Sequence, residues 1–521
     1  MSHVQAASKS LTRPFFITTP IFYASGPPHI GHLYTAVLAD AQQRYQKLLG
    51  RETFFATGTD EHGLKIQNAA KAAALEPAAF TEGTAKKYKD LFSATSVEFD
   101  DFIRTSETRH AVKVGEIWRR LEERGHLRKD KYSGWYCTSD ETFVTEKQVE
   151  EVTRKDGSKA KVSTESGHPV EWTEEETYVF DLSSFQERIK NWLDDNDVIR
   201  PRQFRPHVDI FLGSRGLRDL SVSRPSSRVN WGISVPGDPS QTVYVWLDAL
   251  VNYLTVCPEG HWPPQVQVIG KDILKFHAVY WPAFLMAADL PLPERLLCHS
   301  HWTADDVKMS KSYGNVVCPQ SLIDEGLPSE GLRYFLLKQG VPHTDCNYSH
   351  KKMINYVNSE LCNTMGNLLS RSCANKINQD GIFPGAETVE ECAGARGKDL
   401  LESLRALPSE VGPCYDEFNF YDGIRLVMDN LREANGYFDE CKPWTLKDAS
   451  DLDKKRAVIH VALDSLRVAG ILLQPIVPKL SEDLLTRLNV KGRLWKDVES
   501  SDCGQAINWP QDNRPFFPRQ K

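Results

Sequence analysis

Short apolar runs alternate with longer amphipathic stretches near the start of the chain. The run at residues 15–19 predicts a buried strand, and after a Ser-Gly-Pro-Pro turn the pattern predicts a helix over about residues 29–49. Gly50 then occupies the position that commonly ends a helix. A second strand is predicted at residues 53–57, and a helical pattern follows from about Leu64. Strand, helix and strand in this order predict a right-handed parallel α/β unit.

The next part of the chain, residues 128–240, has a different pattern. Residues 132–136 are aromatic and strand-like, whereas the charged, glycine-containing residues 151–161 are typical of a solvated loop. We therefore expect an insertion that interrupts the parallel sheet. The sheet is expected to resume at Thr242 with the run V-Y-V-W-L.

Beyond the insertion, apolar runs at residues 266–269 and 295–301 predict two more strands of the parallel sheet. Helical patterns dominate after that, and a linker with glycine and proline interrupts them at residues 376–396. The predicted helical stretches are 350–375, 397–408, 411–440 and 453–490. Strands followed by helices indicate separate domains.

Composition narrows the class of protein. The chain has 521 residues, enough for roughly two to four domains. Its net charge of −7 and pI of about 6.1 are not those of a general nucleic-acid binder. The eleven cysteines include no C-x-x-C pair, which argues against a zinc knuckle or a redox dithiol and fits a reducing compartment. No apolar run reaches the ~18 residues of a membrane-spanning helix.

Chemically active side chains follow the first two predicted strands. His29 and His32 lie in the first turn of the predicted helix, where free backbone N–H groups and the helix dipole favour a phosphate. Gly31 between them lets a ligand approach the backbone closely. Asp60, in the segment D-E-H-G, falls on the same edge of the sheet, where ligands of such folds bind. Two packed histidines and a turn-forming aspartate are the alternative interpretation.

A second signal is the loop K-M-S-K-S at residues 308–312, which follows the last predicted strand. Its lysines and hydroxyls suit a leaving polyphosphate, although alone such a pentapeptide is more often a solvated loop. Paired in order with H-I-G-H at residues 29–32, it resembles the double signature of class I aminoacyl-tRNA synthetases. The segments G-T-D-E-H-G, Y-V-W-L-D-A-L and I-G-K-D-I-L-K-F-H extend the similarity to methionyl-tRNA synthetases, with a close likeness to the mitochondrial form over residues 14–500.

The resemblance implies an α/β fold, with a Rossmann-like parallel-sheet catalytic domain, a connective insertion and an α-helical bundle that binds the anticodon. It implies a methionine–tRNA ligase that forms methionyl-adenylate from L-methionine and ATP, releases pyrophosphate, and transfers the methionyl group to the 2′-OH of the terminal adenosine of tRNA(Met). The expected segments are a tail (1–13), the two catalytic halves (14–127 and 241–300), the insertion (128–240), the K-M-S-K-S and stem-contact region (301–349) and the helical domain (350–521).

Site residues are carried over by their match to the motifs. The expected catalytic residues are His29, His32, Lys308 and Lys311, and ATP binding adds Gly31 and Ser310. The expected methionine-binding residues are Ile21, Tyr23, Asp60, Trp246, Ala249, Tyr253, Ile273, Phe276 and His277. Apolar and aromatic walls suit a thioether, and a carboxylate suits the α-ammonium. From periodicity alone, Trp246, Tyr253 and Phe276 are better explained as ordinary core residues.

The helical part carries the expected anticodon site. Asn367 and Arg371 are four residues apart on one helix face, and Trp444 follows a proline farther on. The resemblance implies that they read the CAU anticodon, because an aromatic ring stacks on an unpaired base while amide and guanidinium groups read its edges. A helix-packing tryptophan beside a solvated Asn–Arg pair is the alternative.

The insertion departs from much of the family, in which one or two zinc knuckles are common. Cys137 is its only cysteine, Asp140 stands where a C-x-x-C partner would be, and His168 has no cysteine nearby. We therefore predict no zinc, and the only metal expected is Mg²⁺ with ATP.

Two other functions remain open from the sequence, a nucleotidylyltransferase with the same H-x-G-H helix start and a catalytically inactive tRNA-binding protein. We expect a monomer that does not bind membranes. The acid-free residues 1–39 faintly resemble the tail of an organelle transit peptide, and with the mitochondrial likeness they favour the mitochondrial matrix, with the cytoplasm as the alternative.

Overall fold

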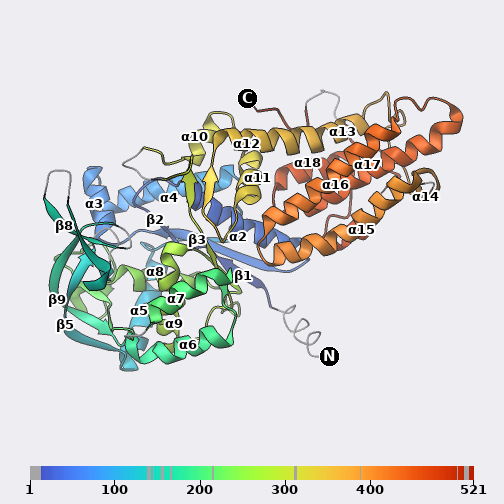
Figure 1. Cartoon of the computed structure of the whole chain (residues 1–521). Helices are drawn as coiled ribbons and strands as arrows, with labels where there is room; N and C mark the ends of the chain where they lie inside the picture. Colours follow the sequence, from blue (N-terminus) through green and yellow to red (C-terminus); the bar gives the residue numbers. More distant parts are fainter. Residues whose placement is uncertain are drawn as a thin grey trace.

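The computed structural model describes most of the chain and divides it into two parts. Figure 1 shows an α/β part that carries the insertion and an elongated helical part formed by the C-terminal third. The described residues are 13–137, 142–144, 146–153, 158–164, 167–213, 216–309, 314–387, 389–500, 503–509 and 515–520.

A parallel sheet forms the centre of the α/β part, as expected. Among the described residues, its strands have the order β10-β16-β15-β1-β3-β2, and β4 also pairs with β3. Every pairing in this sheet is parallel, so the carboxyl ends of its strands meet at one edge. The strands are β1 (Phe15–Thr18), β2 (Phe22–Tyr23), β3 (Thr53–Asp60), β4 (Asp101–Arg104), β10 (Ile199–Arg200), β15 (Val266–Gly270) and β16 (Leu296–His299).

Helix α2 (Ile30–Leu48) confirms the helix predicted at 29–49, and Gly50 beyond it has a φ of 81°, the left-handed conformation that ends helices. The segment after β15 is less regular than predicted. A 3₁₀ turn (Lys271–Ile273) and a π-helix (Phe276–Tyr280) precede its α-helix. The other helices around the sheet are α3 (Leu64–Ala72), α4 (Pro77–Ala94), α5 (Thr108–Glu123), α8 (Val245–Thr255) and α9 (Trp281–Ala287).

The prediction that the parallel sheet resumes at Thr242 is wrong. That residue lies in β14 (Asp238–Val243), which forms a separate antiparallel sheet with β12 (Ser223–Pro225) and β13 (Ser234–Val235). The rest of the run V-Y-V-W-L begins helix α8. A short apolar run has no period of its own and fits a buried helix as well as a strand.

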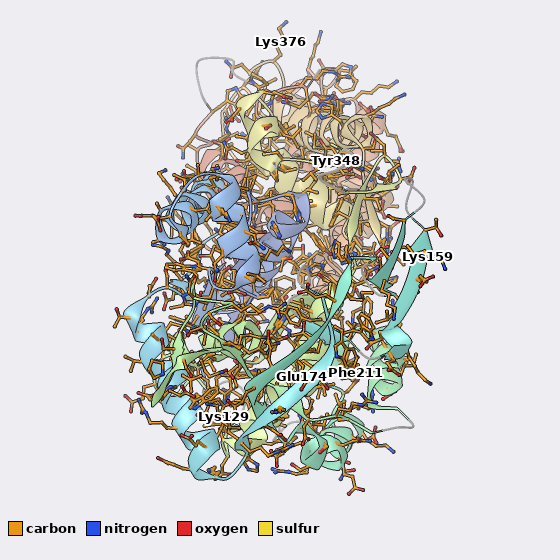
Figure 2. All side chains as sticks on the ribbon, turned by 90° about the vertical axis from the view of Figure 1, so that its left-hand side faces the viewer. Lys129, Lys159, Glu174, Phe211, Tyr348 and Lys376 are labelled. Atoms are coloured by element: carbon orange, nitrogen blue, oxygen red, sulfur yellow. The ribbon has the colours of Figure 1, made fainter. Side chains whose placement is uncertain are left out.

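The insertion is built on a long antiparallel pair, β5 (Leu127–Cys137) with β9 (Val170–Phe180). The prediction of a loop at 151–161 is wrong, because β7 (Val149–Thr153) and β8 (Lys159–Ser163) form a hairpin. Figure 2 shows the long strands crossing one face of the molecule, with Lys129 near one end and Lys159 on the neighbouring hairpin. The remaining elements are β6 (Thr142–Val144), β11 (Leu220–Ser221), α6 (Gln186–Asp195) and α7 (Arg205–Leu212).

The C-terminal third is helical, as expected, but its helices divide differently. Helix α15 (Gly394–Asp416) continues through Pro408, after which the sequence suggested a break, and through Pro413. A proline removes one hydrogen bond, and here the apolar residues on both sides face the same core, so the helix continues. The predicted stretch 453–490 is two helices.

The elements after the sheet complete the chain. Small strands β17 (Trp302–Ala304), β18 (Val307–Lys308) and β19 (Cys346–Tyr348) pair with one another. None of the helices in the described part combines the length and the apolar character that crossing a bilayer requires. The helices are α10 (Pro319–Asp324), α11 (Ser329–Gln339), α12 (His350–Tyr356), a π-helix (Val357–Gly366), α13 (Asn367–Ser372), α14 (Val389–Cys392), α15, α16 (Phe420–Cys441), α17 (Leu452–Leu472) and α18 (Pro478–Arg487).

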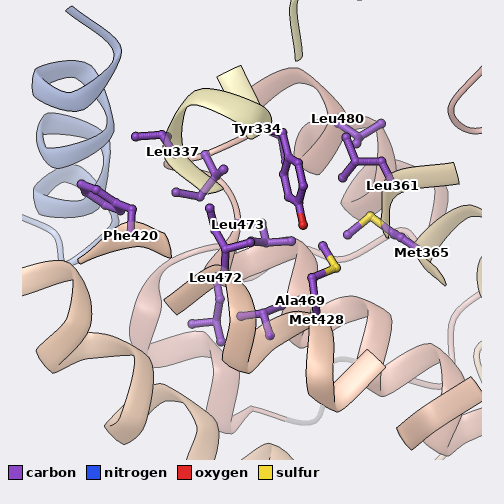
Figure 3. Packing of buried hydrophobic residues seen from close by; sticks show 14 of the residues in the cluster. Tyr334, Leu337, Leu361, Met365, Phe420, Met428, Ala469, Leu472, Leu473 and Leu480 are labelled. Atoms are coloured by element: carbon purple, nitrogen blue, oxygen red, sulfur yellow. The ribbon is translucent and has the colours of Figure 1, made fainter. Parts of the chain in front are cut away.

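One hydrophobic core joins the sheet to the helical part. It contains buried residues of α2, such as Leu33 and Val37, together with residues of α11 and α15 to α18. Figure 3 shows the middle of this core, where side chains from α11, the π-helix and the long helices interdigitate. A second core lies between α5, α8, α9 and the insertion. Helix α2 therefore has its first turn at the ligand edge of the sheet and its body in the shared core.

Candidate active site

A single large cleft brings together the side chains that the sequence selects for ATP and methionine. It has a volume of about 2540 Å³ and is lined by the sheet edge and by the insertion. The expected site residues that line it are Ile21, Tyr23, His29, Gly31, His32, Asp60, Trp246, Ala249, Tyr253, Ile273, Phe276 and His277. Residues as far apart in the chain as Ile21 and His277 thus converge on one site, since chain folding places β15 beside β1 and β16 beside β15.

The first turn of α2 orients two imidazoles. His29 is the N-cap of the helix, and its Nδ1 accepts a hydrogen bond of 3.1 Å from the Gly31 amide. His32 Nδ1 accepts from the His29 amide at 3.3 Å and from the Tyr88 hydroxyl at 3.0 Å. The two rings stack with centroids 3.6 Å apart. Because both Nδ1 atoms accept, each neutral ring carries its proton on Nε2 and can donate it to an anion.

This arrangement corrects the expectation that free backbone amides would hold the phosphate. The Ile30 amide donates to the Val317 carbonyl at 3.1 Å, and the Gly31 amide is used by His29. The favourable helix dipole remains, and these two amides are already used within the protein. A Cβ atom on Gly31 would lie 3.1 Å from Cε1 of His29, so the glycine leaves room for that ring.

The aromatic end of the cleft is rigid and mostly apolar. Trp246 and Phe276 stack in parallel, with ring centroids 3.5 Å apart and 8° between the planes. His277 Nδ1–H donates to the Ile273 carbonyl at 3.0 Å, so its Nε2 accepts from the Tyr253 hydroxyl at 2.7 Å. Burial lowers the pKa of His277 to about 4, which keeps the ring neutral. A neutral, aromatic pocket suits a thioether.

Asp60 lines the same cleft. It is the last residue of β3 rather than a turn residue, and it is only 6% exposed. Its carbonyl accepts from the Ala24 amide at 2.8 Å, which fixes the backbone beside Tyr23. A buried carboxylate in the wall of a cleft is a suitable partner for an ammonium group.

Met309 of the segment K-M-S-K-S lines the cleft, and so does Gly314, two residues beyond the segment. Lys308 is the last residue of β18, whereas Ser310 and Lys311 lie outside the described residues.

The expected anticodon residues lie far along the helical part. The Arg371 guanidinium lies 5.0 Å from the ring centroid of Phe438 and 5.6 Å from that of Trp444, and it forms an ion pair with Asp439. Trp444 is 41% exposed. Asn367 is exposed one turn before Arg371 on α13. An exposed ring beside a guanidinium is a suitable surface for an unpaired base.

The comparisons with known proteins agree with this geometry. Residues 15–373 match the family model described as tRNA synthetases class I (M), and residues 393–511 match the anticodon binding domain of methionyl tRNA ligase. The chain belongs to the methionyl-tRNA synthetase family.

Relatives within this family are similar over nearly their whole length. The mitochondrial methionine–tRNA ligases of Bos taurus and Homo sapiens are 47% and 46% identical to the chain, covering 91% of it and 84% of each relative. The methionyl-tRNA synthetase of Mycobacterium tuberculosis, solved in complex with methionyl-adenylate, superposes with a TM-score of 0.91 at 36% identity, covering 98% of this chain and 100% of that one.

The sequence missed a contact that supports the first turn of α2. Thr35, one turn beyond Gly31, donates to the Gly31 carbonyl at 3.0 Å, and His299 Nε2 lies 2.8 Å from the Thr35 hydroxyl. Both side chains line the cleft. His299 is the last residue of β16, so its place at the carboxyl end of a parallel strand could have identified it.

The insertion holds its shape by strand pairing. Cys137 is buried at the end of β5, opposite Val170 of β9, and His168 is exposed. Asp140 lies outside the described residues. Within the described part, no three His, Cys, Asp or Glu side chains are grouped to bind a metal.

Proposed function

We propose that the chain joins L-methionine to tRNA(Met) in mitochondria, in the matrix, by forming methionyl-adenylate from ATP and then transferring the methionyl group to the 2′-OH of the terminal adenosine. The observation that carries the proposal is one cleft, in a chain of this family, that holds two imidazole donors at a helix start beside an aromatic pocket. The family match of residues 393–511 favours it over a plain nucleotidylyltransferase, which has no need of an anticodon-binding domain.

The phosphate end of the site would stabilise charge. In the first step the methionine carboxylate attacks the α-phosphate in line, and negative charge grows on the phosphate oxygens. His29 and His32 would donate Nε2–H to these oxygens, next to Gly31 and the positive end of α2. Lys308 and Lys311 would neutralise charge on the departing pyrophosphate, and the Ser310 hydroxyl would donate a hydrogen bond to it.

The amino acid would be held at both ends. Asp60 would bind the α-ammonium, and Ile21, Tyr23 and Ala249 would line the side-chain path. The aromatic end, with Trp246, Tyr253, Ile273, Phe276 and His277, would enclose the thioether. No protein nucleophile is needed, because the chemistry is positioning plus charge stabilisation.

The substrate form of the nucleotide would be its Mg²⁺ complex, in which the metal would offset the negative charge of the phosphates. We propose no zinc, a monomer, and no membrane association. The CAU anticodon would meet Asn367, Arg371 and Trp444, and the six segments given above would be the domains.

The test is ATP–pyrophosphate exchange with the twenty amino acids in parallel. We expect exchange that depends on methionine and charging of tRNA(Met) by the same protein. Faster exchange with isoleucine, leucine or cysteine would overturn the proposal. Exchange without any amino acid would favour the nucleotidylyltransferase, and no exchange at all would favour an inactive tRNA-binding protein.

A further inference from the structure

A buried carboxylate is bridged by two histidines directly behind the methionine pocket. Asp248 Oδ2 lies 2.7 Å from His62 Nδ1, and Asp248 Oδ1 lies 2.7 Å from His110 Nε2. Asp248 and His110 are 0% exposed, and His62 is 6% exposed. The second nitrogen of His110 lies 2.9 Å from the Thr255 hydroxyl. Three elements that are distant in the sequence therefore meet at one carboxylate.

The charge state of this cluster fixes which atoms donate. Burial by itself raises the pKa of the Asp248 carboxyl, but the imidazoles of His62 and His110 outweigh it and lower that pKa to about 2. An ionised carboxylate only accepts hydrogen bonds. His62 Nδ1 and His110 Nε2 must therefore both donate to Asp248, as charge-assisted bonds.

The cluster joins the two ends of the proposed methionine site. Helix α8 presents Trp246, Ala249 and Tyr253 to the cleft and directs Asp248 to His62. His62 is two residues after Asp60, and its carbonyl accepts from the hydroxyl of Tyr23 at 3.1 Å. The hydrogen bond between His62 and Asp248 thus connects helix α8, which carries the proposed thioether pocket, to the segment that carries Asp60, the proposed partner of the ammonium.

The other side of the same segment is also held. Glu61 is 0% exposed, and its carboxylate accepts from Arg104 Nε at 2.8 Å and from the Ser106 hydroxyl at 2.6 Å. Arg104 is the last residue of β4, and Ser106 follows it by two residues. Glu61 therefore fixes the segment to the sheet, whereas His62 ties it to the helix that carries the pocket wall.

We propose that Asp248 is a positioning residue that, through His62, sets the place of Asp60 relative to helix α8 and so the fit of the substrate ammonium. This inference rests on the proposed function, since it takes Asp60 as the ammonium partner. Asp248 touches no substrate in this account. It stabilises the bound state by holding two binding groups at a fixed spacing, because a misplaced charged partner loses much of its interaction energy.

The test compares two non-reacting alcohols that differ only in the amine, L-methioninol and 4-(methylthio)butan-1-ol, as inhibitors of exchange. Asp248→Asn keeps the size of the side chain but cannot accept from both imidazoles. We expect the inhibition constant of methioninol to rise about tenfold and that of the deaminated alcohol to stay within about twofold. An equal rise for both alcohols, or no rise for either, would overturn the proposal.

A matched pair at position 62 checks the hydrogen bond itself. His62→Asn places an amide N–H near the position of Nδ1, whereas His62→Gln places it one bond too far. We expect His62→Asn to keep most of the preference for methioninol and His62→Gln to lose it. Equal behaviour of the two variants would also count against the link.

Two controls separate this inference from the function on which it rests. Asp100→Asn alters a structural carboxylate at the opposite edge of the sheet, where it accepts from the Phe55 amide at 2.8 Å, and should leave both inhibition constants unchanged. In the parent protein methioninol must bind better than the deaminated alcohol, and Asp60→Asn must abolish that difference. If either of these two results is not obtained, the role of Asp60 is refuted. If both are obtained but Asp248→Asn leaves the inhibition constants unchanged, only the positioning role of Asp248 is refuted.

Discussion

Single residues at this site owe their chemistry to burial. His277, in the aromatic pocket, and His299, behind the first turn of α2, are both nearly inaccessible to water. Burial lowers the pKa of each to about 4. Both rings are therefore neutral at physiological pH. His277 can accept a hydrogen bond from the Tyr253 hydroxyl, and it carries no positive charge that would repel the ammonium group of the substrate.

These pKa values predict how stability depends on pH. In the unfolded chain both imidazoles have a pKa of about 6.5. As the pH falls toward about 4, the unfolded state therefore binds protons that the folded state does not bind. The free energy of unfolding should fall by up to about 3 kcal/mol for each residue over this window and be unaffected above it. Denaturant titrations between pH 6.5 and 4.5 measure the slope.

His277→Gln isolates one of these contributions. A glutamine stays neutral, so the pH slope of the unfolding free energy should decrease by about one proton, whatever the packing cost at neutral pH. His299→Gln should give a similar decrease. An unchanged slope in both variants would contradict the assignment.

Trp444 carries a prediction for RNA binding. Its exposed ring lies beside Arg371, and stacking on a base is worth about 1–3 kcal/mol. Trp444→Ala should raise the KM for tRNA about tenfold or more and leave methionine-dependent exchange unchanged, whereas Trp444→Phe should keep most of the affinity. A parallel loss of exchange in Trp444→Ala would show instead that the ring holds the fold.

Among the elements, the sequence predicted those whose pattern is local. Helix α2 was placed to within one residue at each end because His29 caps it and Gly50 stops it. The hairpin β7–β8 was not predicted, since its strands are charged and their stability comes from pairing with each other. The sequence suggested a break after Pro408 in helix α15. The helix continues because it packs against a core formed by other helices, which the local sequence does not show.

The same limit applies to the candidate site. Short motifs selected the residues that line the cleft, and those with His29, Asp60 and Phe276 follow strands of the parallel sheet whose carboxyl ends face the ligand edge. The contacts that hold these residues in place could not be predicted from the sequence. Asp248 and His62 are separated by 186 positions, and no local pattern indicates that one donates to the other.

The first turn of α2 allows stability and activity to be separated. Gly31→Ala should gain roughly 0.5–1 kcal/mol of helix propensity, because alanine favours helix, before any cost of moving the His29 cap. The added Cβ would lie 3.1 Å from His29 Cε1, closer than normal contact, so the ring must move. We expect kcat for exchange to fall about tenfold, which corresponds to about 1.4 kcal/mol in the barrier.

Gly83→Ala is the matched control, in the exposed face of α4 with no atom within 4 Å of the added Cβ. It should give the same gain in helix propensity with unchanged kcat. If both variants were equally active, the space beside His29 would have no catalytic importance.

For the whole molecule, α2 is the connection between the ligand edge and the helical part. Tyr45 near its end packs edge-on against Tyr415 and Trp495, each with ring centroids 5.3 Å away. In the middle of the helix, Asp40 forms a buried ion pair with Arg333 of α11, at 2.6 Å. Arg333 also donates to the Ile476 carbonyl, between α17 and α18.

Arg333 should therefore be a stabilising residue of the whole chain. Both Arg333 and Asp40 have fully buried side chains, so Arg333→Met leaves a carboxylate with one remaining ion pair, to Arg44, and should cost about 3–5 kcal/mol of unfolding free energy. Arg425→Met, which removes an exposed guanidinium from the surface of α16, should cost less than about 1 kcal/mol.

A double-mutant cycle decides whether the ion pair itself matters. In an Asp40→Asn background the buried charge is already gone, so Arg333→Met should cost at least about 1 kcal/mol less than it does alone. Equal costs in the two backgrounds would mean that Arg333 acts only through the backbone carbonyls to which it donates, such as those of Thr95 and Ile476. The helix that begins at the proposed ATP site would then be joined to the anticodon-binding part by apolar packing and by hydrogen bonds such as that from the Tyr45 hydroxyl to the Gly412 carbonyl.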